Sequence, residues 1–147
     1  MKALIQRVRS ASVRINNKSI SKINLGLLVF LGVYKDDDIN DIIYLVNKTC
    51  SMRIFPDTNN KINYSIKDIK GSILVVSQFT LCANIKKGNR PNFTNAAQSQ
   101  YAKKLYLKFC SNLRKNNINV FEGVFGENMD VQLINDGPFT IYIDSKL

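Results

Sequence analysis

The stretch Val75-Val76-Ser77-Gln78-Phe79-Thr80-Leu81 is the one around which we expect the fold to be organised, because an apolar run ends there in hydroxyl and amide side chains. The pattern predicts a buried strand that becomes polar at its end. Successive strand residues point to opposite faces, so Gln78 and Thr80 are expected on one face, and Ser77 and Phe79 on the other. One face can then hold a ligand while the other packs in the core. A strand that turns polar only for solubility is the alternative interpretation.

Strand patterns dominate the chain before this stretch. Residues 2–34 predict three strands: Ala3 to Val8, Ala11 to Ile20 broken by a turn at Asn16-Asn17, and Leu25 to Tyr34. Asparagine tolerates positive φ, which suits a hairpin turn. The chain therefore begins as an antiparallel meander.

One helix and two extended segments are expected next. Apolar residues recur at helical spacing behind acidic N-cap candidates, which predicts a helix from about Asp38 to Cys50. Met52 to Phe55 predicts a short strand that ends before the turn at Pro56-Asp57. Residues 62–69 are ambiguous, and their apolar alternation favours an extended edge segment beside the strand that leads to Ser77.

A basic loop follows the central stretch. Residues 82–93 carry Gly and Pro and are not expected to form a regular element. Lys86, Lys87 and Arg90 lie on this loop, a few residues beyond the polar strand end. We predict that these three side chains contact phosphates, with a merely solvated loop as the alternative.

A second helix is expected after the loop. Thr94 or Asn95 can cap it, and apolar residues recur every four positions along it as far as about Asn112. Three lysines fall largely off this apolar stripe: Lys103, Lys104 and Lys108. They form a basic outer face, a pattern that more often reflects solvation than binding.

The last third of the chain predicts strands at 120–121, 131–134 and 139–143. The dense turn signal Asn135-Asp136-Gly137-Pro138 separates the last two. A Gly-Pro pair allows positive φ, removes one backbone donor and is among the few peptide bonds that occur in the cis form. We therefore expect a rigid turn with exposed carbonyls. Residues 1–147 as a whole predict one α+β domain with a mainly antiparallel sheet and two helices.

The residue types that are missing exclude several kinds of chemistry. The chain has no histidine, which excludes Ser-His-Asp and Cys-His catalysis and every histidine-ligated metal site. Cys50, Cys82 and Cys110 are widely spaced and form no CxxC pair, so we expect reduced packing residues. No metal and no cofactor is predicted. Any hydrolytic base must be a carboxylate, a lysine or a group on the substrate.

The composition is strongly basic, with 21 Lys and Arg against 11 Asp and Glu and a formal net charge of +10. Such a charge attracts polyanions, so RNA, DNA or an anionic membrane each fit. A general bias of the chain towards Lys, Asn and Ile is the alternative. The N-terminal segment is too charged for a signal peptide, and no apolar run is long enough to span a bilayer. We expect a soluble cytoplasmic protein.

Two segments together carry a resemblance. Ser77-Gln78-Phe79-Thr80-Leu81 and Asn135-Asp136-Gly137-Pro138-Phe139-Thr140 are similar to the two signature motifs of the D-aminoacyl-tRNA deacylase family. The similarity runs the length of the chain and includes Phe125-Gly126 followed by Asn128-Met129. The resemblance implies a β-barrel-like fold with helices packed outside.

The resemblance also implies an activity and an assembly. The family hydrolyses the ester bond of D-aminoacyl-tRNA, and of glycine mischarged on alanine tRNA, as a homodimer with shared active sites. The resemblance implies that Ser77, Gln78, Phe79 and Thr80 line the catalytic pocket. It assigns substrate binding to the following residues: Gly137 and Pro138 of the other subunit, Met129, and Arg7, which braces the Gly-Pro turn.

A mechanism without histidine is chemically reasonable for such a substrate. An aminoacyl ester is already activated, so backbone N–H groups near Phe79 and Thr80 can stabilise the oxyanion while the ribose 2′-hydroxyl assists proton transfer. Thr80 as a covalent nucleophile is the competing mechanism. Two other functions remain open: a non-catalytic basic nucleic-acid-binding protein, and a small hydrolase of free D-aminoacyl esters.

Overall fold

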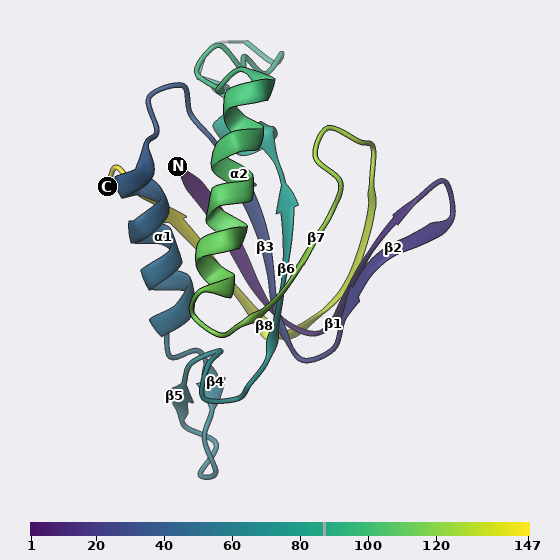
Figure 1. The fold of residues 1–147 in the computed structure, drawn as a ribbon, viewed down its shortest axis with the longest axis vertical. Helices are drawn as coiled ribbons and strands as arrows, with labels where there is room; N and C mark the ends of the chain where they lie inside the picture. Colours follow the sequence, from purple (N-terminus) through teal and green to yellow (C-terminus); the bar gives the residue numbers. More distant parts are fainter. Residues whose placement is uncertain (87) are drawn as a thin grey trace.

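A curved, mainly antiparallel sheet is the centre of the molecule in the computed structural model, which describes residues 1–86 and 88–147. Helices α1 (Ile39–Ser51) and α2 (Ser99–Arg114) lie side by side on one face of the sheet (Figure 1). The sheet order is β2-β1-β3-β6-β7. β2 and β3 share one edge of β1, and β8 pairs with its opposite edge. The expected α+β class with two helices outside a barrel-like sheet is confirmed.

Strand β1 (Lys2–Ile15) organises the antiparallel part. One of its edges pairs along almost its whole length with β8 (Asp130–Asp144). Its other edge pairs first with β3 (Gly26–Gly32) and then with β2 (Lys18–Ile23). β1 therefore joins two of the predicted strands into one. Asn16 and Asn17 have φ of 48° and 63°, which confirms the predicted hairpin turn.

Strand β6 (Ser72–Ser77) is the predicted buried strand, and its four central residues are buried. It pairs in parallel with β3 and with β7 (Asn119–Glu122). Because both edges of β6 are occupied, the prediction that residues 62–69 form an edge segment beside it is wrong. β5 (Ile62–Tyr64) pairs instead with β4 (Phe55–Pro56), which is shorter than predicted.

Both faces of the sheet bury apolar side chains. The larger cluster lies between the sheet and the helices and contains Leu45, Phe109 and Leu113. The smaller cluster lies on the opposite, concave face and contains Leu74 and Val76. A sheet that is apolar on both faces must be covered on both, and here helices cover one face while the curvature of the sheet closes the other.

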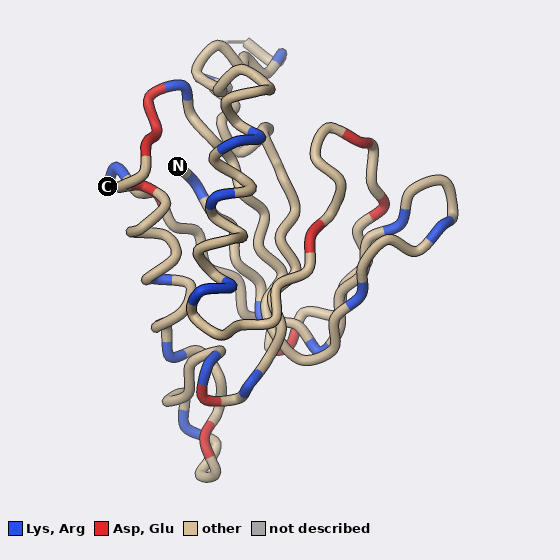
Figure 2. Tube along the Cα trace, in the orientation of Figure 1, with Lys and Arg blue, Asp and Glu red and all other residues tan. Residues whose placement is uncertain are grey.

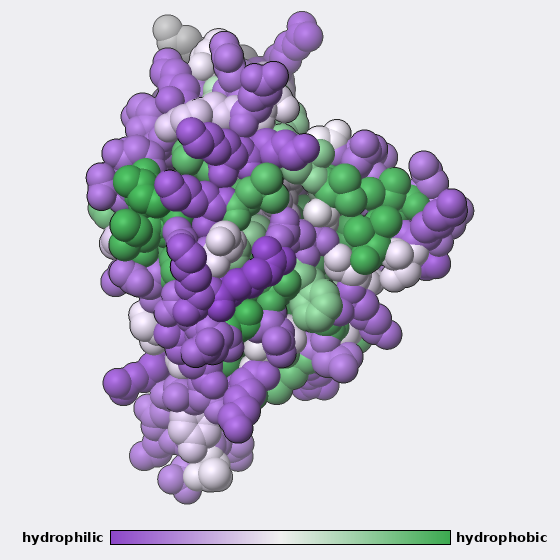
Figure 3. All heavy atoms as spheres, viewed as in Figure 1, coloured by the Kyte–Doolittle hydropathy of each residue, from purple (hydrophilic) through white to green (hydrophobic). Residues whose placement is uncertain are grey.

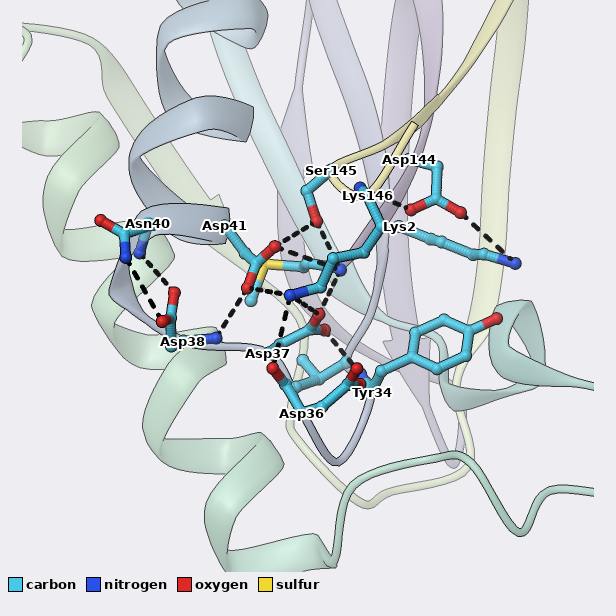
Figure 4. Close-up of polar contacts among 12 residues, drawn as sticks. Lys2, Tyr34, Asp36, Asp37, Asp38, Asn40, Asp41, Asp144, Ser145 and Lys146 are labelled. Atoms are coloured by element: carbon cyan, nitrogen blue, oxygen red, sulfur yellow. Dashed lines mark hydrogen bonds and ion pairs between the residues drawn. The ribbon is translucent and has the colours of Figure 1, made fainter.

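Helix α1 has the predicted start and nearly the predicted end. Asp38 is its N-cap and forms a capping box with Asp41. Asp41 also accepts hydrogen bonds from Ser145 and Lys146, and Asp37 binds the N-terminal ammonium group of Met1 (Figure 4). The first turn of α1 thereby holds both ends of the chain together.

Helix α2 starts later than predicted, because residues before it are used elsewhere. The amide of Ala97 donates to the carbonyl of Val33 at 2.9 Å, and Ala96 forms a bridge with Tyr34. The helix therefore begins at Ser99, with Gln98 rather than Thr94 or Asn95 as the N-cap residue. No helix in the described part of the chain is long and apolar enough to cross a membrane.

The Gly-Pro motif lies inside a strand. Asn135 pairs with Val8 and Thr140 pairs with Gln6, so β8 continues on both sides of the motif, where two separate strands were predicted. The intervening residues form a large bulge opposite Arg7. Gly137 has a φ of 146°, and the Gly137-Pro138 peptide bond is cis.

Candidate active site

A pocket of about 440 Å³ opens at the carboxyl end of β6. Its main walls are the end of β6, the start of α2 with the residues just before it, and residues 125–129, and Leu31, Val33 and Val131 complete the lining. Of the predicted pocket residues, Ser77, Gln78, Phe79 and Met129 line it. The residues that line it from the α2 side are Ala96, Ala97, Ser99, Ala102 and Tyr106.

The polar end of β6 is held tightly against β3. The amide of Gln78 donates to the carbonyl of Leu31 at 2.8 Å, which extends the β3–β6 pairing beyond Ser77. A Cβ atom on Gly32 would lie 2.9 Å from Cβ of Leu81 and 3.1 Å from the carbonyl oxygen of Gln78. Glycine at position 32 is therefore what allows the following turn to pack on β3.

The predicted strand alternation ends at Ser77. The next residues form a 3-10 turn, η1 (Phe79–Cys82), closed by the amide of Leu81 donating to the carbonyl of Gln78. The amides of Phe79 and Thr80 begin this turn and have no hydrogen-bond acceptor among the described residues. Two adjacent free N–H groups are the donors that an oxyanion requires.

The side chains of this turn form a small polar group beside an aromatic one. The amide Nε2 of Gln78 donates to Oγ1 of Thr80. Phe79 is 59% exposed, and its ring packs edge-on against Phe93 at 4.9 Å between centroids. Phe93 belongs to the loop after η1, so this contact ties the loop to the rim of the pocket.

Residues 123–129 form the opposite wall. The amide of Gly123 donates to the carbonyl of Val75 at 2.9 Å, and the amide of Val124 donates to Sδ of Met129 at 3.3 Å. A Cβ atom on Gly123 would lie 2.7 Å from that sulfur. Met129 is therefore positioned by its own loop.

The cysteines do not serve the site. All three thiols are free and buried. Burial raises the pKa of Cys82 to about 11 and that of Cys110 to about 12, and it raises the pKa of Cys50 as well. A thiol with a raised pKa carries little thiolate and is a poor nucleophile.

The predicted site residues did not include four polar side chains that line the pocket: Ser99, Tyr106, Glu127 and Asn128. Tyr106 is buried, donates to the carbonyl of Val75 at 2.9 Å and has its pKa raised by burial. Glu127 also lines the pocket and brings a carboxylate to it. Glu127 stands between the pairs Phe125-Gly126 and Asn128-Met129, and its position in that segment was the available signal.

The Gly-Pro turn is separated from the pocket of its own chain. Arg7 lies opposite the turn. In the sheet, Arg7 of β1 is paired with Leu27 of β3, and Leu27 is paired with Ile73 near the start of β6, whereas Ser77 is the last residue of β6. At ordinary strand spacings, the Gly-Pro turn is therefore roughly 13 Å from Ser77 along the strand direction and roughly 14 Å from it across the strands. Gly137 and Pro138 are exposed, and neither lines the pocket.

Arg7 holds this turn through several contacts. Its Nε donates to the carbonyl of Asp136 at 2.9 Å and lies 3.4 Å from the Asp136 carboxylate. Its Nη1 donates to the carbonyl of Ile54, and its guanidinium lies 4.8 Å from the ring centroid of Phe139. Arg7 is only 9% exposed, so the turn is anchored from inside the protein.

The predicted phosphate contacts lie on the loop between η1 and α2. Lys86 and Arg90 are exposed there, and neither lines the pocket. Asn84 and Asn92 bridge the two ends of this loop. Lys87 lies outside the described residues. The loop starts directly after η1.

The fold and the pocket together define a small α+β barrel protein with a pocket at the end of β6, beside a turn whose first two backbone amides have no acceptor among the described residues. The family model described as D-Tyr-tRNA(Tyr) deacylase matches residues 4–144. The chain is 50% identical over 146 residues to a D-aminoacyl-tRNA deacylase of Fusobacterium nucleatum, covering 99% of this chain and 97% of that protein. The chain belongs to the D-aminoacyl-tRNA deacylase family.

Two solved structures resemble the fold closely. One, a c-Myc DNA Unwinding Element Binding Protein, has a TM-score of 0.93 and 38% sequence identity and covers 98% of each chain. Another, a probable eukaryotic D-amino acid tRNA deacylase, has a TM-score of 0.83 at 20% identity and covers 97% of each chain. The second likeness concerns the fold alone.

Proposed function

We propose that the protein hydrolyses the ester bond between a D-amino acid and the 3′ end of tRNA, and that it does so in the pocket at the end of β6. Membership of the D-aminoacyl-tRNA deacylase family supports the reaction. The free amides of Phe79 and Thr80 are the observation that supports this pocket as its site. We extend the proposal to glycine mischarged on alanine tRNA and to a cytoplasmic location.

The proposed mechanism uses the substrate as its own proton carrier. Water attacks the ester carbonyl, and the amides of Phe79 and Thr80 stabilise the developing oxyanion. The ribose 2′-hydroxyl beside the ester takes up the proton that the attacking water releases and passes its own proton to the leaving 3′-oxygen. The Thr80 hydroxyl accepts a hydrogen bond from Gln78 and has no carboxylate or amine bonded to it among the described residues. This arrangement favours a positioning role for Thr80 over that of a nucleophile.

The proposal includes a homodimer in which each pocket is completed by the partner's Gly-Pro turn. The exposure of Gly137 and Pro138, their distance from the pocket of their own chain, and the Arg7 brace support this. A rigid turn presents its carbonyl oxygens in one arrangement, which can bind the α-ammonium of one enantiomer only. Because such a wall reads the main chain of the amino acid, many D-side chains are tolerated.

A second candidate function is non-catalytic nucleic-acid binding. Two observations favour it: the net charge of +10, and the 38% identity to a protein named for binding a DNA unwinding element. It requires that Gln78→Ala and Thr80→Ala leave function intact while loss of Lys86, Lys87 and Arg90 abolishes it.

The test is deacylation of D-tyrosyl-tRNA and L-tyrosyl-tRNA, each with a ribose or a 2′-deoxyribose at the terminal adenosine. We expect the D-ester alone to be cleaved, with a loss of about 10²-fold or more on the deoxy substrate, as when a general acid–base group is removed. Equal cleavage of both enantiomers would refute the stereospecific function. Full activity on the deoxy substrate would refute the assistance by RNA.

A further inference from the structure

The excess positive charge of this protein is confined to one part of the chain. Between Asp68 and Glu122 the sequence contains no Asp or Glu, and it contains nine Lys and Arg residues. The remainder of the chain holds 12 basic residues, 21 minus nine, against all 11 acidic ones, so it is nearly neutral. A general bias towards lysine would spread the excess positive charge evenly along the chain, whereas here it lies in one segment.

The acid-free segment includes both the pocket wall and helix α2. Figure 2 shows basic positions along α2 and no acidic position on it. Lys104 and Lys108 are one turn apart and lie on the exposed side, and Lys115 continues their row just beyond the helix. In Figure 3 hydrophilic side chains cover most of α2, while apolar ones gather beside α1 and beyond β7.

Helix α2 also leads away from the pocket. Ser99, its first residue, and Ala102 line the pocket. Lys103 is exposed one turn beyond Ser99, on the side of the helix that adjoins the pocket. With a rise of about 1.5 Å per residue, Lys103, Lys104 and Lys108 occupy about 7.5 Å of the helix, beginning one turn from the pocket rim.

These lysines have no protein partner in the described part of the chain. Lys103, Lys104 and Lys108 form no ion pair there, whereas Arg114, at the end of the helix, is paired with Glu122 at 2.6 Å. Like charges one turn apart repel each other, and no nearby carboxylate offsets the repulsion. The arrangement is unfavourable in the free protein and favourable once an anionic partner lies against it.

We propose that the outer face of α2, with Lys103, Lys104 and Lys108, is the docking surface for the duplex stem of the tRNA whose 3′ end enters the pocket. This inference rests on the proposed function and adds to it where the body of the RNA lies. A group of cations that begins one turn from the pocket and follows the helix away from it matches a phosphate backbone that leads away from a bound 3′ terminus. The contacts are to phosphates and are independent of base sequence.

The test compares two triple variants of the full chain. Lys103→Gln/Lys104→Gln/Lys108→Gln removes the row, and Lys18→Gln/Lys22→Gln/Lys61→Gln removes three exposed lysines from outside the acid-free segment. Lysine and glutamine have similar helix propensities, so α2 is expected to fold in both, and thermal melts confirm it. Binding of uncharged tRNA is measured across a range of salt concentrations, and KM and kcat are measured on D-tyrosyl-tRNA.

We expect the α2 variant to bind uncharged tRNA about tenfold more weakly, with a salt slope smaller by about 2. Its KM on D-tyrosyl-tRNA rises by a similar factor at unchanged kcat, and its activity on the D-tyrosyl ester of adenosine is that of the wild type. The control variant changes each quantity less than about twofold.

Three results would overturn the docking surface. They are unchanged tRNA binding by the α2 variant, an equal loss in the control variant, and an equal loss on a single-stranded oligonucleotide that carries only the tRNA 3′ sequence. Because binding of uncharged tRNA needs no turnover, this outcome is independent of whether the wild type hydrolyses D-tyrosyl-tRNA. Absence of that hydrolysis would instead refute the proposed function.

Discussion

Two backbone amides at the start of η1 are the smallest feature on which the proposed chemistry depends. They are available because a 3-10 turn leaves its first N–H groups without internal acceptors. An oxyanion bound there is stabilised by donors that need no reorganisation during the reaction. Side chains of the pocket then serve to shape it and to position water.

Substitution of Glu127 tests whether the proton carrier is the substrate hydroxyl or a carboxylate of the protein. If the substrate hydroxyl carries the proton, Glu127→Gln lowers kcat on D-aminoacyl-tRNA less than about threefold, whereas loss of a general base costs about 10²- to 10⁴-fold. Single-turnover kinetics measure the difference. Glu122→Gln is the matched control, because Glu122 lies near the same loop and does not line the pocket. A large loss in Glu127→Gln alone would assign the base to the protein.

Arg7 connects residue-scale chemistry to the stability of the Gly-Pro turn. Arg7→Ala leaves the carbonyls of Asp136 and Ile54 without their donor, and we expect it to lower the free energy of unfolding by about 2–4 kcal/mol. Denaturant titration measures this. Arg7→Lys should recover only part of the loss, because an ammonium group cannot reproduce the planar fork of donors. Full recovery with lysine would contradict the bracing role.

The packing of η1 on β3 is the element-scale feature that shapes the pocket. Gly32→Ala brings a methyl group to 2.9 Å from Leu81, so η1 must move away from β3. We expect a loss of about 1–3 kcal/mol in stability and a fall in kcat/KM that exceeds the loss of folded protein. A normal kcat/KM in folded Gly32→Ala would show that the packing of η1 on β3 does not shape the pocket.

Gly88→Ala is the control for this substitution. Gly88 has a φ of 70°, so alanine there strains the backbone, but no atom lies within 4 Å of the added Cβ. We therefore expect a small loss of stability at unchanged kcat/KM. The comparison separates displacement of η1 from the general cost of replacing a glycine.

The first turn of α1 predicts a pH dependence. Burial tends to raise the pKa of Asp41, but hydrogen bonds from Ser145, the Asp38 amide and Lys146 outweigh it and lower that pKa from 3.8 to about 2. A folded-state pKa below the unfolded value stabilises the protein above pH 3.8, and this stability is lost as pH falls towards 2. The shift corresponds to about 2 kcal/mol.

Chemical unfolding between about pH 5 and pH 2 checks this dependence. The wild type should lose about 2 kcal/mol more over that range than Asp41→Asn does. Burial raises the pKa of Asp37, which acts in the opposite direction and remains in both proteins. Asp130→Asn, at an exposed position at the start of β8, is the surface control. Identical pH profiles for wild type and Asp41→Asn would contradict the assigned bonds.

At the scale of the whole molecule, the proposed dimer predicts complementation. A pocket variant, Gln78→Ala/Thr80→Ala, and a turn variant lacking Gly137 and Pro138 should each lose D-aminoacyl-tRNA deacylation when pure. After mixing and subunit exchange, half of the dimers contain one of each chain and one intact site, so about a quarter of wild-type activity returns. Sedimentation measures the dimer, and no recovery on mixing would refute the shared site.

Local chemistry made several features predictable from the sequence. Asp38 caps α1 and the turn at Asn16-Asn17 closes the first hairpin, as expected. Each depends on the φ preference, hydrogen-bonding capacity or apolar spacing of neighbouring residues. Such preferences act within a few residues and are visible in a single sequence.

Pairing between distant segments was decided only by the tertiary structure. β8 continues through Gly137-Pro138 because β1 pairs with it on both sides of the motif, and α2 starts only at Ser99 because the amide of Ala97 donates to the carbonyl of Val33. The α2 wall of the pocket and the position of Tyr106 follow from the same packing. The sequence by itself determined which residues are polar, flexible or apolar, and where the positive charge accumulates. Which of them meet was settled by strand pairing and burial, because those energies depend on residues far apart in the chain.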